Sequence, residues 1–254
     1  MADGVILYKG PSLLDGAPIV VIATGFKRAS DNVKTGGMIQ TYILRSGVSP
    51  TVAIKTGDDA SICGDCLHRG AGDGSGRTCY VNVGQGPLAV WRAFRAGKYP
   101  HVDDVEFCGS WLTLFRGRKV RLGTYGDPAA APTRLWALVT GHGMVGPGAS
   151  GWTGYTHQWR TRPDLQPYCM ASVDTIADTR EAQLAGWRTF RVALPNAAAR
   201  ILNEVICPAS AEAGKKLTCS ACMACSGGNR RGSIVIQAHG GFAVMANIKR
   251  RVAA

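Results

Sequence analysis

Four of the nine cysteines fall in one short stretch, ICPASAEAGKKLTCSACMAC, near the C-terminal end of the sequence. Cys219, Cys222 and Cys225 are each two residues apart, and Cys207 stands upstream, directly before a proline. A C-x2-C-x2-C run with a distant Cys-Pro is typical of the ligands of a [4Fe–4S] cluster. Structural zinc sites more often have two separated C-x2-C pairs. The spacing predicts a cysteine-rich metal-binding insertion over residues 207–232, with an iron–sulfur cluster favoured over zinc.

A second group of cysteines lies in ICGDCLHRGAGDGSGRTCYVNVGQGP, where Cys63, Cys66 and Cys79 are separated by two and twelve residues. Glycine, serine and aspartate fill the gap, so the chain can fold three thiolates around one centre. Two interpretations stay open. His68 completes a structural Cys3His zinc site, or the three cysteines hold a [4Fe–4S] cluster with one iron open to an external ligand.

The cysteine count also bears on compartment and cofactor. The first residues, MADGVILYKG, have an acidic residue where a signal peptide has basic ones. We therefore expect no export and a cytoplasmic location, in which nine cysteines serve as thiols and metal ligands rather than disulfides. The isolated Cys108 and Cys169 are expected to be core thiols.

Charge and hydropathy limit the partners. No apolar run reaches eighteen residues, so we expect no membrane partner. Lys and Arg number 29 against 17 Asp and Glu, a formal net charge of +12, which favours a nucleotide or nucleic acid. The basic residues are scattered except for the run KRR at 249–251, and a merely basic surface is the alternative.

The stretches that must position these groups read as alternating strands and helices. Residues 1–38 are expected to form an N-terminal hairpin extension, with strands at 5–8 and 18–23. Helices are expected at 87–98, 105–115, 128–139, 175–185 and 242–252, with another short helix opening at Ser49-Pro50. Eight further strands are expected at 39–44, 78–83, 119–125, 152–156, 168–173, 189–194, 204–207 and 233–238.

Strands separated by helices are typical of a parallel α/β sheet, and eight strands predict a TIM-like (β/α) barrel, complete or irregular. The 254 residues then form one barrel domain, because a barrel of this size is a common single domain. An open doubly wound sheet is the alternative. No G-x-G-x-x-G or P-loop sequence follows any expected strand, which argues against a nucleotide-binding domain of those two types.

In such barrels the chemistry lies where strands end, at the C-terminal face. The candidate catalytic residues are the polar side chains at those ends: Tyr125, Asp127, His157, Asp174, Arg191 and His239. Each has a structural alternative, because Asp127 and Asp174 are also good helix caps and His157 is a candidate buried histidine. Gly240 and Gly241 after His239 would let the backbone approach a ligand closely.

Several stretches carry a family resemblance: CGDCLHRG, CYVNVGQGP, GTYGDPAA, TGYTHQW, MASVD, GWRTFRV and ICPAS with GKKLTCSACMAC. Across residues 35–240 the sequence resembles a family of uncharacterised proteins from bacteriophages and other mobile elements. The resemblance implies the cytoplasm of a bacterial or phage-infected cell, and it brings no established activity.

A cysteine trio that feeds a (β/α) barrel, followed by a second cysteine group, is similar to radical S-adenosylmethionine enzymes with an auxiliary cluster. This similarity implies that Cys63, Cys66 and Cys79 hold a [4Fe–4S] cluster whose open iron binds S-adenosylmethionine. The family's usual trio, however, is C-x3-C-x2-C in the loop after the first strand. The trio here is C-x2-C-x12-C and enters the second expected strand, and no Gly-Gly-Glu-like segment for the methionine is found.

Two classes of function follow. The first is a radical-SAM-like iron–sulfur enzyme that acts on a nucleotide or nucleic acid. The second is a zinc-stabilised nucleic-acid-binding protein in which both metals are structural. Between them stands a zinc-stabilised barrel that exchanges or hydrolyses a base, with Asp127 or Asp174 as nucleophile or base.

Overall fold

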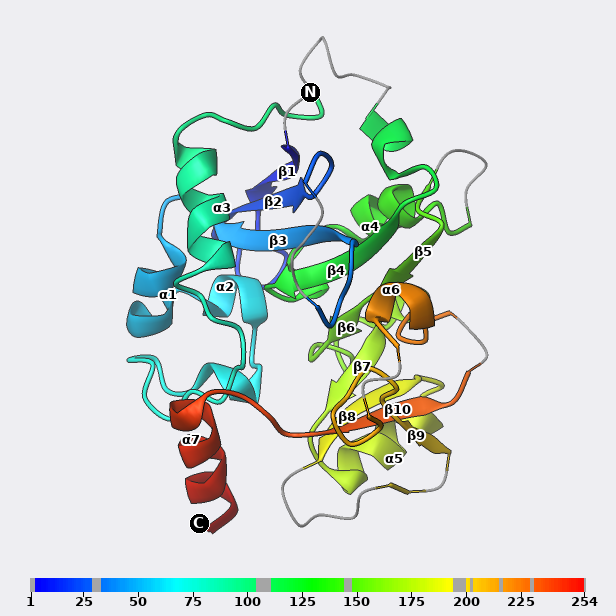
Figure 1. The fold of residues 1–254 in the computed structure, drawn as a ribbon. Coiled ribbons are helices and arrows are strands. Elements are labelled where there is room, and N and C mark those ends of the chain that lie inside the picture. Colours follow the sequence, from blue (N-terminus) through cyan, green and yellow to red (C-terminus); the bar gives the residue numbers. More distant parts are fainter. Residues whose placement is uncertain are drawn as a thin grey trace.

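The fold is given by a computed structural model that describes residues 3–28, 33–103, 111–143, 148–193, 200–201, 203–214, 217–228 and 231–253. Within these residues the chain has a mixed α/β fold with two five-stranded sheets and seven α-helices. Figure 1 shows the first sheet above the second, with helices on the outside.

The first sheet has the order β1-β2-β3-β4-β5. Its strands are β1 (Gly4–Pro11), β2 (Pro18–Thr24), β3 (Ile39–Arg45), β4 (Lys119–Tyr125) and β5 (Gly151–Thr153). The β1–β2 and β2–β3 pairs are antiparallel, whereas β3–β4 and β4–β5 are parallel. The expected N-terminal hairpin therefore exists, and it is an integral part of this sheet because β2 also pairs with β3.

The second sheet is entirely parallel, with the order β6-β7-β8-β10-β9. Its strands are β6 (Tyr155–Thr156), β7 (Met170–Val173), β8 (Thr189–Ala193), β9 (Glu204–Ile206) and β10 (Ser233–Gln237). Only Gly154 separates β5 from β6. A Cβ at Gly154 would lie 2.8 Å from the Tyr168 carbonyl oxygen and 3.0 Å from the Cys169 sulfur, so the junction requires glycine.

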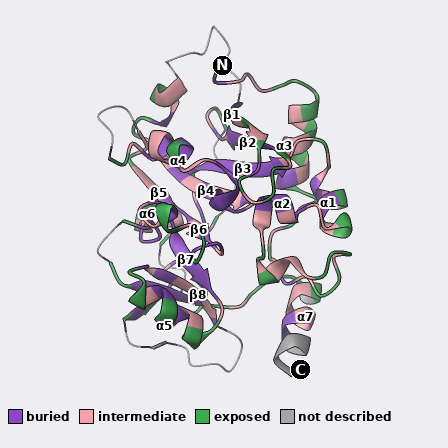
Figure 2. Ribbon diagram, turned by 180° about the vertical axis from the view of Figure 1, so that it is seen from behind, coloured by how far each residue is buried: buried purple, intermediate pink, exposed green. Residues whose placement is uncertain are grey.

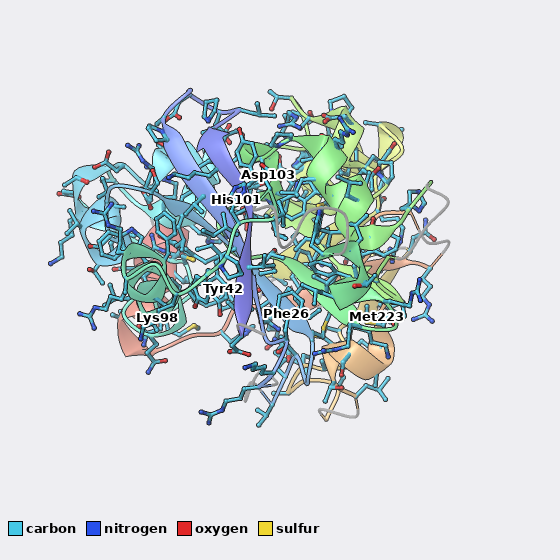
Figure 3. All side chains as sticks on the ribbon, turned by 90° about the horizontal axis from the view of Figure 1, so that it is seen from above. Phe26, Tyr42, Lys98, His101, Asp103 and Met223 are labelled. Carbon is cyan, nitrogen blue, oxygen red and sulfur yellow. The ribbon has the colours of Figure 1, made fainter. Side chains whose placement is uncertain are left out.

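The α/β class expected from the sequence is confirmed. The edge strands are β1 and β5 in the first sheet and β6 and β9 in the second, and in the described part of the chain no strand pairing joins the two sheets. The structure thus shows two consecutive sheets rather than a closed barrel. One further segment adjoins the first sheet: His101 (labelled in Figure 3) forms a parallel bridge with Ile6 of β1. The Ile6 N–H donates to the Pro100 carbonyl, and the Val102 N–H donates to the Ile6 carbonyl. This contact covers an otherwise unpaired edge.

Seven helices connect and flank the strands. They are α1 (Pro50–Thr56), α2 (Ala60–Cys63), α3 (Gly86–Arg95), α4 (Thr133–Thr140), α5 (Ile176–Leu184), α6 (Cys219–Cys222) and α7 (Phe242–Ala253). Short 3-10 helices occur at Leu67–Arg69, Trp111–Phe115, Pro128–Ala130 and Pro163–Leu165. None of the described helices is long and apolar enough to cross a membrane.

The predicted strand 78–83 is wrong. Residues 78–82 are irregular, because the backbone N–H groups of Thr78 and Cys79 donate to the His68 carbonyl instead of to a neighbouring strand. The expected helix 128–139 is divided into a 3-10 turn and α4. Pro132 forces Ala131 into an extended conformation, with φ −111° and ψ 159°.

Two other expectations change in detail. Thr175, not Asp174, caps α5, and its hydroxyl accepts from the Asp178 N–H. Only the end of the expected helix 105–115 is described, and it is a 3-10 helix. Residues 105–110, with Cys108, lie outside the described residues. Cys169 is a buried core thiol, as expected.

The main core lies around both sheets. The fully buried residues follow the strands, above all Ile19–Ala23 in β2 and Cys169–Ala171 at β7 (Figure 2). A second, smaller apolar cluster surrounds Cys207 and Cys225 and includes Ile234 and Ile236 of β10. The second cysteine group is therefore packed into the fold.

Candidate functional site

One cavity of about 350 Å³ lies over one face of the parallel strands, and we call it the central cavity. Alternate residues of three strands line it: Arg121 and Tyr125 of β4, Phe190 and Val192 of β8, and Ile234 and Ile236 of β10. Both cysteine groups line it. Its lining includes the seven cysteines Cys63, Cys66, Cys79, Cys207, Cys219, Cys222 and Cys225. Groups from distant parts of the sequence meet here because every second residue of each strand points to the same face.

The first cysteine group follows β3 and depends on a buried carboxylate. Cys63 ends α2, and Cys66 precedes the 3-10 turn Leu67–Arg69. The Asp59 carboxylate accepts from Arg69 at 2.7 and 3.0 Å and from Arg77 at 3.3 Å. These bonds draw the two ends of the glycine-rich loop together and bring Cys79 toward the other two cysteines.

Burial raises the pKa of the Cys66 thiol to about 12, and it raises the pKa of Cys63 and Cys79 as well. The charges of Cys66 and Cys79 would raise the pKa of Cys63 further, so the three thiols lie near one another. Without a metal the group is held neutral. Metal binding therefore has to displace protons from these thiols.

His68 does not point to this group. One ring nitrogen, Nδ1, lies 2.8 Å from the Thr78 hydroxyl, and the other, Nε2, lies 2.9 Å from Asp174 Oδ1. Zinc binding through one ring nitrogen of His68 would have to displace one of these two contacts. His68, Asp127 and His157 line the cavity with the three cysteines. Among the described residues, however, none of them forms with two cysteines a group whose donor atoms all lie within 4.8 Å of one another.

The second cysteine group surrounds α6. Cys207 follows β9, Cys219 and Cys222 begin and end α6, and Cys225 comes three residues later. Burial raises the pKa of Cys225 to about 12, a hydrogen bond from Tyr155 lowers it, and the charges of the other three cysteines raise it. The four thiols therefore lie near one another, and the Tyr155 hydroxyl supports one of them.

Backbone contacts hold this second group in place. The N–H groups of Cys219 and Ser220 donate to the carbonyls of Lys34 and Thr35, at 2.8 and 3.0 Å. Met223, at the end of α6, lies against Gly151 of β5 (Figure 3). Arg188 donates to the carbonyls of four residues around the last cysteine: Ala224, Ser226, Arg231 and Gly232.

Four of the six predicted catalytic residues line the central cavity: Tyr125, Asp127, His157 and His239. Asp127 acts as a cap as well, because its carboxylate accepts from the N–H groups of Ala129 and His157, at 2.9 and 2.8 Å. Burial raises the pKa of Asp127. Two buried atoms, Tyr125 Oη and His157 Nε2, have no hydrogen-bond partner among the residues that the structure describes, which is uncommon for buried polar groups.

Asp174 and Arg191 lie elsewhere. Asp174 is not among the residues that line the cavity, but it contacts His68, which lines it. Arg191 forms a fully buried, two-bond ion pair with Glu204, at 2.8 and 2.7 Å, between β8 and β9. An arginine in that position joins parts of the second sheet and does not face the cavity.

His68, His157 and Asp174 form the one group of three possible metal ligands among the described residues whose donor atoms all lie within 4.8 Å of one another. The two histidine rings meet edge to face at 5.5 Å. This arrangement is not specific for a metal, because Asp174 and Thr78 already hold His68 by hydrogen bonds. It equally suits proton transfer at the cavity wall.

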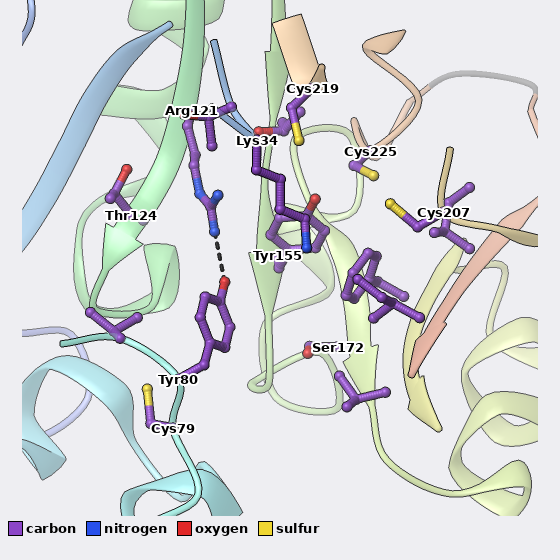
Figure 4. A pocket seen from close by; sticks show the side chains of 18 of the residues that line it. Lys34, Cys79, Tyr80, Arg121, Thr124, Tyr155, Ser172, Cys207, Cys219 and Cys225 are labelled. Carbon is purple, nitrogen blue, oxygen red and sulfur yellow. Dashed lines mark hydrogen bonds between the residues drawn. The ribbon is translucent and has the colours of Figure 1, made fainter. Parts of the chain in front are cut away.

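Sequence reasoning missed four polar residues of the cavity: Lys34, Tyr80, Arg121 and Tyr155. Figure 4 shows them between the two cysteine groups, with Cys79 on one side and Cys219 on the other. Arg121 lies on β4 four residues before Tyr125, a spacing that places both on one face of an ideal strand, so period-two reasoning could have found it. Nothing in the sequence marks Lys34.

No protein-family model, curated protein or solved structure matches this chain. The site must therefore be interpreted from its own chemistry.

Proposed function

We propose that this protein is an iron–sulfur enzyme acting on a nucleotide or nucleic acid. Cys63, Cys66 and Cys79 would hold one [4Fe–4S] cluster, and the four cysteines of the second group would hold another. The observation that carries the proposal is that both cysteine groups line one cavity. Metals with purely structural roles have no need to share a cavity.

The donor chemistry fits this assignment. Zinc at about 2.3 Å from each thiolate places tetrahedral sulfurs only about 3.8 Å apart. Among the described residues no three cysteine sulfurs lie within 4.8 Å of one another. A [4Fe–4S] cluster attaches its thiolates to separate irons and therefore accepts wider spacing.

A radical-SAM-like reaction has two supports. The first cysteine group lies in the connection after β3, the first strand of the parallel series, which is the position that the resemblance implies. The open series of parallel strands is consistent with an incomplete (β/α) barrel. A cluster on three thiolates would supply an electron to a molecule bound at its open iron, such as S-adenosylmethionine.

Side chains of the cavity would transfer protons to or from the substrate and orient it. Tyr125 Oη and His157 Nε2 are buried atoms that still offer a hydrogen bond. Asp127 fixes the backbone of His157, so the imidazole keeps its direction. His157 is the group best placed to take or give a proton at the substrate, because its ring is within reach of the His68–Asp174 pair.

The test is the metal content of anaerobically purified protein, with a visible spectrum. We expect about four or about eight irons per chain and absorbance near ~400 nm, the numbers and colour of one or two such clusters. One or two zincs in colourless protein after growth with iron would overturn the proposal.

A second candidate is favoured by the net charge of +12. In it both cysteine groups hold structural zinc and the basic surface binds nucleic acid. It predicts that a chelator unfolds the protein and that affinity for single-stranded DNA falls steeply with salt. Affinity for DNA that does not change with salt would contradict it.

A further inference from the structure

Arg121 stands out among the cavity residues because no carboxylate of the described residues forms an ion pair with it. Its side chain extends from β4 into the space between the two cysteine groups (Figure 4). Nη2 donates to the Tyr80 hydroxyl at 2.8 Å, and the guanidinium carbon lies 6.0 Å from the centre of the Tyr155 ring. Within the described residues Nε is buried with no hydrogen-bond partner, and no carboxylate lies within 4.0 Å of the guanidinium.

Such an arrangement is costly in the protein alone. Arg121 is half-buried, and a guanidinium that is partly removed from water is stabilised by a counter-ion or by hydrogen-bond acceptors for its buried N–H groups. A phenol and an aromatic face compensate it only in part. The remaining donors would fit an anion that enters the cavity, and a guanidinium matches phosphate by two parallel hydrogen bonds.

A second cation accompanies Arg121. Lys34 also lines the cavity, and its ammonium lies 3.3 Å from His239 Nε2. Both cations lower the pKa of the Cys219 thiol, so both lie near the same point of the cavity wall.

Flat apolar surfaces lie next to these cations. The Tyr80 and His239 rings are stacked with centroids 5.7 Å apart, and Tyr155 meets Phe190 edge to face at 4.6 Å. Aromatic side chains of this kind stack on nucleobases. A cavity of about 350 Å³ is at the small end of small-molecule sites.

We propose that Arg121 and Lys34 form the phosphate-binding subsite of the central cavity, and that the ligand is a mononucleotide whose base packs against the neighbouring aromatic rings. This inference rests on the proposed function for the reaction, and it names the substrate class of that same site. The competing explanation is that a cluster on the second cysteine group, through Cys219, is the counter-ion of Arg121.

The experiment measures, by isothermal titration of the purified holoprotein, the affinity of each of the four ribonucleoside monophosphates and of its parent nucleoside. We expect at least one monophosphate to bind about tenfold or more tightly than its nucleoside, since one strong charge-assisted contact is worth about that factor. Arg121→Met should abolish this preference. Arg92→Met, which removes an exposed arginine on α3, should preserve it.

Lys34→Met is the second variant, and it should reduce the preference even if Arg121→Met fails to fold. The proposal is overturned if no monophosphate binds more tightly than its nucleoside, if both variants keep the preference, or if only an oligonucleotide binds. Iron content is measured in the same samples. Wild-type protein without iron would overturn the proposed function alone, whereas loss of iron in Arg121→Met with an unchanged phosphate preference would identify a cluster as the counter-ion.

Discussion

At the scale of single residues, the central cavity contains buried polar groups that form no hydrogen bond with the described part of the protein. Tyr125 is 2% exposed, and its hydroxyl has no hydrogen-bond partner within the described part of the chain. Burial also raises its pKa, so the hydroxyl stays protonated and can donate. A group of this kind is costly to keep in the fold, and a role toward a ligand explains its presence.

The prediction is that Tyr125→Phe stabilises the metal-free protein while it weakens ligand binding. Removing an unsatisfied buried hydroxyl should raise the free energy of unfolding by about 1 kcal/mol. Urea denaturation measures the change. Tyr8→Phe is the control, because the Tyr8 hydroxyl donates to the Pro11 carbonyl at 2.7 Å and its loss should not stabilise. A destabilised Tyr125→Phe would mean that its hydroxyl has a partner in solution.

A pH dependence follows from the buried thiols. The pKa values of Cys66 and Cys225 are each raised from 9.0 to about 12 by burial. Between these values the folded metal-free protein binds more protons than the unfolded chain, so their contribution is present below pH 9 and is lost as pH rises toward 12.

We therefore expect the free energy of unfolding of reduced, metal-free protein to fall between about pH 9 and about pH 12. Denaturant titrations across that range measure it. In a Cys66→Ala, Cys225→Ala double variant the free energy of unfolding should depend less steeply on pH. Some dependence should remain, because tyrosines and lysines also titrate in this range. An equally steep dependence in the variant would assign the effect to those other groups.

At the scale of elements, the loop that carries the first cysteine group is held mainly by Asp59. Its side chain is 3% exposed and joins Arg69 and Arg77 from the two ends of the loop. Arg69 also donates to the carbonyls of Gly57 and Gly64. The ion pairs of the Asp59 carboxylate thus hold this loop in place, whereas backbone hydrogen bonds of helices and strands hold most of the fold.

Asp59→Ala should lower the free energy of unfolding by about 3 kcal/mol, because it leaves two partly buried guanidinium groups without their anion. It should also reduce iron bound by the first cysteine group. Thermal denaturation and metal analysis measure both effects. Asp73→Ala, at the exposed tip of the same loop, serves as the control and should change neither. Normal iron content in Asp59→Ala would show that the first cysteine group does not need Asp59 to bind iron.

The sequence predicted most of the regular elements because their signals are local. The apolar runs at β2, β3, β4 and β10, and Pro128 and Gly186 at helix boundaries, lie where the structure has them. The strand predicted at residues 78–83 was wrong, because the alternation of apolar and polar residues there reflects burial beside the cavity. Which carbonyl the Thr78 N–H meets depends on the fold of the whole loop.

At the scale of the whole molecule, the two cysteine groups form two clusters of thiols on one cavity. For Cys63 and Cys225, the nearby charges that raise the thiol pKa most come from cysteines of the same group. Arg121, Tyr80 and Tyr155 lie between the groups (Figure 4). This layout predicts that each cysteine group binds its metal separately and that both groups face the same cavity.

We expect Cys66→Ser and Cys222→Ser each to lose about four irons per chain and to keep the iron of the other group, since each cluster holds four. Each variant is the control for the other. Iron analysis and electron paramagnetic resonance of the reduced protein measure the two contents. Loss of all iron in either variant would mean that the seven cysteines act as one centre.

The sequence by itself determined the spacing of the cysteines, the basic charge and the alternation of strands and helices, because these are properties of neighbouring residues. It also placed polar residues at strand ends, and four of the six line the cavity. Only the tertiary structure decided that two cysteine groups about 130 residues apart meet at one cavity. The tertiary structure also pairs Arg191 with Glu204, places Asp174 in contact with His68, and places Arg121 and Lys34 near the same thiol. These outcomes depend on contacts between distant residues, and local pattern carries no information about such contacts.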